Sequence, residues 1–243
     1  ALPILHLRSY ISTADPQLRA AFDTFRAQDV RDFIANTVTH PGNISKAESI
    51  AKWNEESRPA AVQEAIDKTG LDGAFGQIVC IGFDLCDTGE ADAVYGLDEA
   101  DVLTRFNDAL KVIRHADLLS TTVVGHNVAG FDLRFLLQRH IVNGIRPHPL
   151  IARAAQAKPW ESEKVFDTMV QFAGVGNRIS LDKLCLALGL PGKGDITGAD
   201  VWPMVQAGKL AEVADYCIDD VRKTRAVFKR MTFSNADLLK QAA

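Results

Sequence analysis

The sequence contains no apolar run that approaches the ~20 residues of a membrane-spanning helix, which excludes that class of membrane protein. Its first residues also lack the continuous apolar core of a signal peptide, because Arg8 and Tyr10 interrupt it. We therefore expect a cytoplasmic protein without membrane contact. The composition is ordinary for a globular chain, and no internal repeat or low-complexity tract is visible.

Signatures of metal–thiolate and nucleotide sites are equally scarce. The four cysteines are scattered, without a CxxC pair or a neighbouring histidine, so we expect reduced core residues. There is no GxGxxG, P-loop or Gly-x-Ser-x-Gly motif, which leaves a small-molecule enzyme on an α/β fold without support. The net charge of −4 gives no global positive field for nucleic acid, although a local basic rim would be sufficient.

What the sequence does contain is a succession of strand and helix patterns. Its 243 residues are enough for a single domain, 1–243, with a sizeable core. The patterns predict an α/β fold, a mixed β-sheet with helices packed on its faces. A polar helical segment at about 36–70, after the first strand, is interpreted as an inserted arm. We expect strands at 3–7, 77–85, 91–96 and 121–124, the second and third of them joined as a hairpin, and a strand running into a helix at 164–173. We expect helices at 18–34, 99–115, 131–143, 181–188 and 209–231, with Asp98 and Ser180 as caps of the second and fourth. Loops are expected after Pro147 and Pro149 and at 189–195.

The stretch Val123–Asp132 is the most informative part of the chain. An apolar strand ends there, residues 125–130 turn the chain, and a helix follows from Phe131. Asp132 would then lie in the first helical turn, just beyond the carboxyl end of a strand. A carboxylate in that position suits a cation at the sheet edge, or it favours the helix start electrostatically. This stretch alone leaves both interpretations open.

Tyr216 and Asp220 form a second candidate pair, on the last long helix. Their four-residue spacing places both side chains on one helix face. A hydroxyl and a carboxylate that share a face can act together, one orienting a water and the other holding a metal. By spacing alone, an ordinary amphipathic surface is the simpler interpretation.

Taken together, Asn127-x-x-x-Phe131-Asp132 and the later Tyr216-x-x-x-Asp220-Val221 resemble the second and third motifs of the DEDDy 3′-5′ exonucleases. That resemblance implies a ribonuclease H-like fold. The chain is most similar to stand-alone proteins that resemble the proofreading exonuclease domain of family B DNA polymerases. The segments at 41–44, 76–82, 166–169 and 188–194 also look like that subfamily, so the likeness covers nearly the whole chain.

The resemblance implies hydrolysis of a phosphodiester with two Mg²⁺ or Mn²⁺ ions held by four carboxylates. Asp132 and Asp220 would be catalytic metal ligands, and Tyr216 would orient the attacking water. Asn127 and Phe131 would shape the strand-end loop, whereas His126 is expected to pack it. The implied partner is nucleic acid, with single-stranded DNA 3′ ends as substrate. Candidate contacts, each also compatible with plain packing or surface, are Asn127, Phe131, Arg134, Phe135, Arg178 and Lys193.

The first motif of that family, an Asp-x-Glu pair at the end of the first strand, has no counterpart. The expected acids fall on Arg8 and Tyr10, which cannot ligate a hard cation as carboxylates do. Asp84 mimics the motif, but it lies on what matches the second strand. We expect Arg8 to pair with Asp132, Asp220 or both, so that its guanidinium replaces the metal charge.

Three explanations of this departure remain open. The protein is a degenerate member that binds nucleic acid or a partner without catalysis, it uses an altered and weaker metal site, or acids from elsewhere complete the site. We favour the first, so cation binding is expected to be weakened or absent and the exonuclease activity impaired or lost. The alternative function is a catalytically silent nucleic-acid-binding or protein-interaction module on the exonuclease fold.

Overall fold

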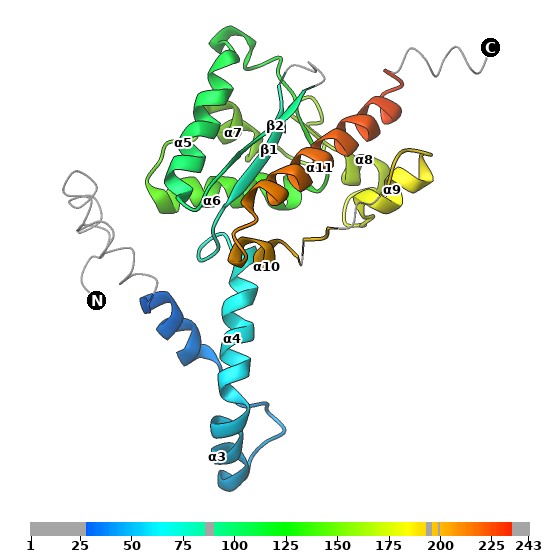
Figure 1. The fold of residues 1–243 in the computed structure, drawn as a ribbon. Coiled ribbons are helices and arrows are strands. Elements are labelled where there is room, and N and C mark those ends of the chain that lie inside the picture. Colours follow the sequence, from blue (N-terminus) through cyan, green and yellow to red (C-terminus); the bar gives the residue numbers. More distant parts are fainter. Residues whose placement is uncertain (1–27, 86–89, 193–195, 199, 235–243) are drawn as a thin grey trace, which may run out of the picture. The chain divides into compact units, whose positions relative to one another are not determined.

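The computed structural model describes residues 28–85, 90–192, 196–198 and 200–234 (Figure 1). The chain divides into two compact units, Ala1–Gly76 and Gln77–Ala243. The expected strand at 3–7 and most of the expected helix at 18–34 lie outside the described residues, as do Arg8 and Tyr10.

The described part of the first unit is helical. It contains a helix at 28–37, then α3 (Ala47–Glu56), α4 (Arg58–Lys68) and the 3₁₀ turn η1 (Thr69–Leu71). Pro59 lies in the first turn of α4, where its missing N–H costs no helical hydrogen bond. Neither α3 nor α4 buries a residue, which agrees with the polar helical segment expected there.

The second unit begins with an antiparallel hairpin, β1 (Cys80–Asp84) and β2 (Ala91–Tyr95), as predicted. Successive residues of β1 point to opposite sides of the hairpin. Phe83 packs on Phe106 of α5 (Glu99–Ala109), with ring centroids 5.6 Å apart. On the other side, Gly82 lies against α11 (Leu210–Met231), so the hairpin is covered on both faces.

Asp98 caps α5 as predicted, because its side chain accepts from the backbone N–H groups of Ala100 and Asp101. The helix ends at Ala109, earlier than expected, and two 3₁₀ turns follow, η2 (Leu110–Val112) and η3 (His115–Asp117). The β-branched Ile113, which follows η2, has extended backbone. The buried core next to these elements comprises Leu103, Phe106, Leu110, Val128, Leu133, Leu136, Ile151, Ala154 and Val165.

A buried ion pair ties α5 to α6 (Leu133–Asn143). The Arg139 guanidinium donates to both carboxylate oxygens of Glu99, at 2.8 and 2.7 Å, and both side chains are almost fully buried. The same carboxylate accepts from the backbone N–H of Ile78 and from the Asn143 amide. One acid therefore fixes the entry to β1 and two helices.

The parallel strands β3 (Val123–Gly125) and β4 (Val165–Asp167) form a second small sheet, and β4 runs directly into α8 (Thr168–Ala173). The strand-to-helix prediction at 164–173 is thus confirmed. The expected single mixed sheet is not formed by the described strands, which make two separate two-stranded sheets, one antiparallel and one parallel.

The prediction of a loop after Pro147 and Pro149 is wrong in one part, because α7 (Pro149–Ala154) forms there. Pro149 stands in the first turn of this helix, and the His148 side chain accepts from the Leu150 N–H. Proline at a helix start is as favourable as proline in a loop, so the pattern permits both. The short α10 (Val201–Gln206) was not predicted either.

The long helix α11 packs against several elements of the second unit (Figure 1). It packs on α9 (Leu181–Ala187), which Ser180 caps as predicted, through Leu184, Cys185 and Val227. It also meets β4, because Phe166 and Phe228 stack edge to face with ring centroids 4.9 Å apart. No helix in the described part of the chain is long and apolar enough to cross a membrane.

Candidate active site

One buried carboxylate holds the loop that follows β3. Asp167, at the end of β4, is only 3% exposed and accepts from the backbone N–H groups of Asn127 (2.9 Å) and Ala129 (3.0 Å). It also caps α8 through the Met169 N–H. Hydrogen bonds to a charged acceptor are the strong ones. Asp167 therefore fixes the path of the chain toward Asp132.

Two close approaches shape the same loop. A Cβ at Gly125 would lie 2.4 Å from the Cβ of Val128, so no other residue fits there without displacing the loop. Asn127 adopts the left-handed conformation (φ 59°), and a Cβ at Gly130 would lie 2.6 Å from its Oδ1. The π-helical turn η4 (Val128–Asp132) follows and delivers Asp132 to the start of α6.

His126 packs the loop, as expected. Its Nδ1 lies 2.9 Å from Thr168 Oγ1, and its Nε2 lies 2.9 Å from the carbonyl oxygen of Ile179. The Thr168 hydroxyl lies 3.1 Å from the Gly125 carbonyl oxygen, to which it donates. Both ring nitrogens are thus engaged, and the imidazole connects the loop to the segment before α9.

Asp132 is partly exposed to solvent, and its carboxyl group is a weaker acid than an ordinary aspartic acid. Part of its surface is exposed, yet the surrounding protein withdraws water from the carboxyl group. This desolvation raises its pKa to about 6, and the negative charge of Asp167 adds to the rise. A carboxyl group whose ionised form is disfavoured in this way gains from a nearby cation, and such groups are frequent at functional sites.

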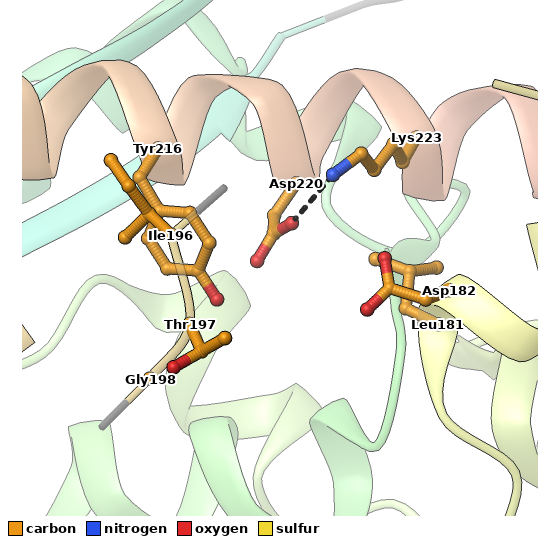
Figure 2. A pocket seen from close by; sticks show the side chains of 8 residues that line it. All are labelled: Leu181, Asp182, Ile196, Thr197, Gly198, Tyr216, Asp220 and Lys223. Carbon is orange, nitrogen blue, oxygen red and sulfur yellow. Dashed lines mark ion pairs between the residues drawn. The ribbon is translucent and has the colours of Figure 1, made fainter. Parts of the chain in front are cut away.

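The second half of the candidate site is a cavity of about 260 Å³ beside α11 (Figure 2). Tyr216, Asp220 and Lys223 line it from one face of the helix, as their spacing requires. Asp182, at the start of α9, lies opposite, and Leu181 and residues 196–198 complete the described lining. In Figure 2 the Tyr216 hydroxyl and the Asp220 carboxylate point into the same space.

Tyr216 and Asp220 interact directly within this cavity. The phenol donates a hydrogen bond to the carboxylate. Burial and the Asp220 charge raise the pKa of Tyr216, so the hydroxyl stays protonated and remains a donor. Burial also raises the pKa of Asp220, although the hydrogen bond from Tyr216 and the charge of Lys223 oppose this rise.

Cys217 connects the two halves of the site. Its pKa is raised by the hydrogen bond with Cys80, by burial, and by the negative charges of Asp220 and Asp132. Because both carboxylates act on one thiol, they lie within electrostatic reach of the same point on α11. The second-motif and third-motif candidates, which are far apart in the sequence, thus both act on the acidity of this thiol.

The other predicted contact residues differ in their exposure to solvent. Phe131 and Phe135 stack with ring centroids 5.3 Å apart and are half-buried, whereas Arg134 and Arg178 are exposed. Lys193 lies outside the described residues, so its predicted role stays a prediction. Asp84, the acid that mimics the first motif, instead forms an ion pair with Arg225 of α11 at 2.5 Å.

The donors of this site suit a hard divalent cation in kind but are few. Asp132 and Asp220 offer the carboxylate oxygens that Mg²⁺ and Mn²⁺ prefer. Within the described ranges, no three His, Cys, Asp or Glu side chains lie close enough together to hold a cation. Mg²⁺ is commonly held by one or two carboxylates with waters and substrate phosphates, so the chemistry of these two side chains is compatible with such an ion, and their joint role as its ligands stays a prediction.

The sequence patterns predict no role in the site for Asp167, Asp182 or Lys223. Asp167 carries a local signal, a strand-ending Asp directly before a helix, which is typical of an N-cap. Its contacts with the 126–129 loop span about forty residues and leave no such signal. Lys223 is detectable in retrospect, because it follows Tyr216 and Asp220 at seven and three residues and thus shares their face.

The described residues thus comprise a mixed α/β domain with a tyrosine–carboxylate pair at a cavity and a further carboxylate beyond a strand end. Residues 71–243 match the family described as a predicted 3′-5′ exonuclease related to the exonuclease domain of PolB. The match covers more than half of the chain, so the protein belongs to this family of 3′-5′ exonuclease-related proteins. No curated protein matches the sequence. Exonucleases of this kind act on nucleic acid and generally use divalent metals.

Proposed function

We propose that the protein binds the 3′ ends of single-stranded DNA at the Asp132–Asp220 site and that its exonuclease activity is attenuated. The observation that carries the proposal is the hydrogen-bonded pair of Tyr216 and Asp220 facing a polar cavity, with Asp132 in electrostatic reach of the same face. Family membership supplies the reaction class, and the cavity supplies a place for a phosphodiester.

Each residue has a role that follows from its chemistry. Asp132 and Asp220 would hold the cation through their carboxylate oxygens. A bound Mg²⁺ or Mn²⁺ supplies charge stabilisation at the phosphoryl oxygens and an acidified water. Tyr216, which stays protonated, orients the attacking water through its hydroxyl. Asp167 is a positioning residue, because it holds the loop before Asp132 and does not reach the cavity.

The nucleic-acid contacts are proposed around Asp132. The exposed Arg134 and Arg178 suit backbone phosphates, and the half-buried pair of Phe131 and Phe135 suits a terminal base. Asn127 would shape the loop that receives it. Phosphate contacts of this kind make binding strongly dependent on salt.

The finer fold assignment belongs to the same proposal. We infer a ribonuclease H-like fold in a single domain, with the helical segment at about 36–70 inserted as an arm after the first strand. The parallel pair β3–β4, the β1–β2 hairpin and the family match support this arrangement. It accounts for a carboxylate beyond a strand end next to a helix that carries a second one.

The attenuation follows from the first motif, where Arg8 and Tyr10 stand in place of the two acids. Without them, two carboxylates remain of the four implied by the family resemblance. A specific observation also favours the second candidate function, a silent binding module. The ammonium of Lys223 lies 3.6 Å from Asp220 and supplies a positive charge to the site without any metal.

The experiment is digestion of a 3′-labelled single-stranded oligonucleotide with Mn²⁺, combined with binding of the same oligonucleotide followed by fluorescence anisotropy. We expect binding, with slow hydrolysis that is lost in Asp132→Ala and in Asp220→Asn, and that increases in Arg8→Asp combined with Tyr10→Glu. Asp92→Asn, on the exposed side of β2, is the matched control. Hydrolysis that survives Asp132→Ala would refute the site. Binding without hydrolysis in the intact protein would select the silent module.

A further inference from the structure

Lys223 is the cation among the described residues that line the cavity, and the proposed reaction gives it no role. Its side chain is only 8% exposed. Its Nζ lies 2.7 Å from Asp219 Oδ2 and 3.6 Å from Asp220 Oδ1. In Figure 2 the ammonium reaches back along α11 to the Asp220 carboxylate.

The arrangement is asymmetric. Asp219 is 48% exposed and makes the short contact, whereas Asp220 is 38% exposed, makes the longer one and also accepts the Tyr216 hydroxyl. A buried ammonium requires a carboxylate partner, because an unpaired charge there would be costly. Asp219 satisfies this requirement. The Lys223 ammonium can therefore stay paired with Asp219 while Asp220 exchanges Lys223 for another cation.

We propose that Lys223 is an internal counter-cation that competes with a divalent cation for Asp220 and thereby sets the metal affinity of the cavity. The inference rests on the proposed function, since it takes Asp220 as a metal ligand. Like charges so close to one carboxylate repel each other, and the low solvent exposure of Lys223 limits the screening of this repulsion. Lys223 is therefore a positioning residue that acts through Asp220.

The first test is a titration with Mn²⁺ alone, followed by the electron paramagnetic resonance of free Mn²⁺. Lys223→Met keeps the apolar stem and removes the charge, so we expect Mn²⁺ to bind tighter by on the order of tenfold. The matched control is Lys209→Met, which removes a positive charge at the N-cap of the same helix, about four turns from Lys223, where the ammonium pairs with Glu212. We expect the control to leave the affinity unchanged within about twofold.

The second test is a double-mutant cycle with Asp219→Asn, which removes the alternative partner of the ammonium. In competition, this substitution turns Lys223 fully toward Asp220, so it should lower Mn²⁺ affinity more in the intact background than in Lys223→Met. Simple loss of one negative charge would lower it by the same factor in both backgrounds. Equal factors overturn the proposal, as does an affinity that Lys223→Met leaves unchanged.

Further outcomes are decisive as well. Mn²⁺ binding that appears only in Lys223→Met supports the competition, whereas binding in neither protein overturns it. The gain should disappear when Asp220→Asn is added. Where Lys223→Met does not fold by circular dichroism, Lys223→Gln takes its place with the same expectation. The proposed function fails separately, if DNA stays intact at a Mn²⁺ concentration that saturates the binding curve.

Discussion

Replacement of Asp132 by asparagine should stabilise the protein at neutral pH in the absence of divalent cations. The fold raises the pKa of this carboxyl group from 3.8 to about 6, chiefly by desolvation. A rise of that size corresponds to about 3 kcal/mol between the two protonation states. Because part of Asp132 faces solvent, screening reduces this to about 1 kcal/mol. Asparagine keeps the shape and the acceptor oxygen but carries no charge, so it should recover this free energy.

The sign of the pH dependence follows from proton binding. Between pH 4 and pH 6 the unfolded chain has already released the Asp132 proton, whereas the folded protein still holds it. The native state therefore binds more protons, and its free energy of unfolding decreases as the pH rises through this window. Above pH 6 the penalty is fully developed. Asp132→Asn lacks it, so the variant and the original protein should diverge from pH 4 to pH 7.

The measurement is urea unfolding followed by circular dichroism at pH 4, 5, 6 and 7, with EDTA present. The control is Asp92→Asn, which also removes one negative charge but from an exposed strand position. We expect a gain of about 1 kcal/mol at pH 7 for Asp132→Asn that shrinks toward pH 4, and no comparable trend for the control. A destabilised Asp132→Asn would refute the reasoning. It would point to a cationic partner of the carboxylate, as in the predicted pairing with Arg8.

Three further substitutions test the supports of the site by urea unfolding. Arg139→Met should cost about 3–5 kcal/mol, because it leaves Glu99 buried without its guanidinium partner, and adding Glu99→Gln should restore part of the loss. Asp167→Ala should lower the free energy of unfolding by about 2 kcal/mol, because the N–H groups of Asn127 and Ala129 lose their acceptor. It should also weaken Mn²⁺ binding, although residue 167 is no ligand. An unchanged Mn²⁺ affinity would contradict its positioning role. Gly82→Ala should cost about 1–3 kcal/mol, because its Cβ would meet the Cys217 carbonyl oxygen at 2.9 Å, whereas Gly96→Ala, with its nearest neighbour at 3.4 Å, should be tolerated far better.

Local signals account for the parts of the fold that the sequence predicts well. The β1–β2 hairpin, the caps at Asp98 and Ser180 and the strand-to-helix passage at 164–173 depend on residues a few positions apart. Where two local outcomes share one signal, the prediction fails, as at Pro149. The expected single sheet depends on how distant strands associate, which period and propensity do not encode.

The same distinction applies to the candidate site. The spacing of Tyr216 and Asp220 correctly places them on one helix face, because helix geometry is local. The contact of Asp167 with the loop at 127–129 joins segments about forty residues apart, and no pattern in either segment predicts it. Lys223 is a third case, because its place on the helix face can be predicted from the sequence, whereas its burial cannot.

Charge balance, more than the presence of motif residues, decides what such a site can do. Asp132 and Asp220 both have a raised pKa, so the fold leaves them short of positive charge. Three cations can supply it: a divalent metal, the predicted Arg8, or Lys223. Lys223 and Arg8 are tethered and do not acidify water, whereas the metal does. Under the proposed function, hydrolysis would therefore proceed only to the extent that a metal displaces a tethered charge. The Mn²⁺ affinities of Lys223→Met and of the Arg8 variant would measure that displacement directly.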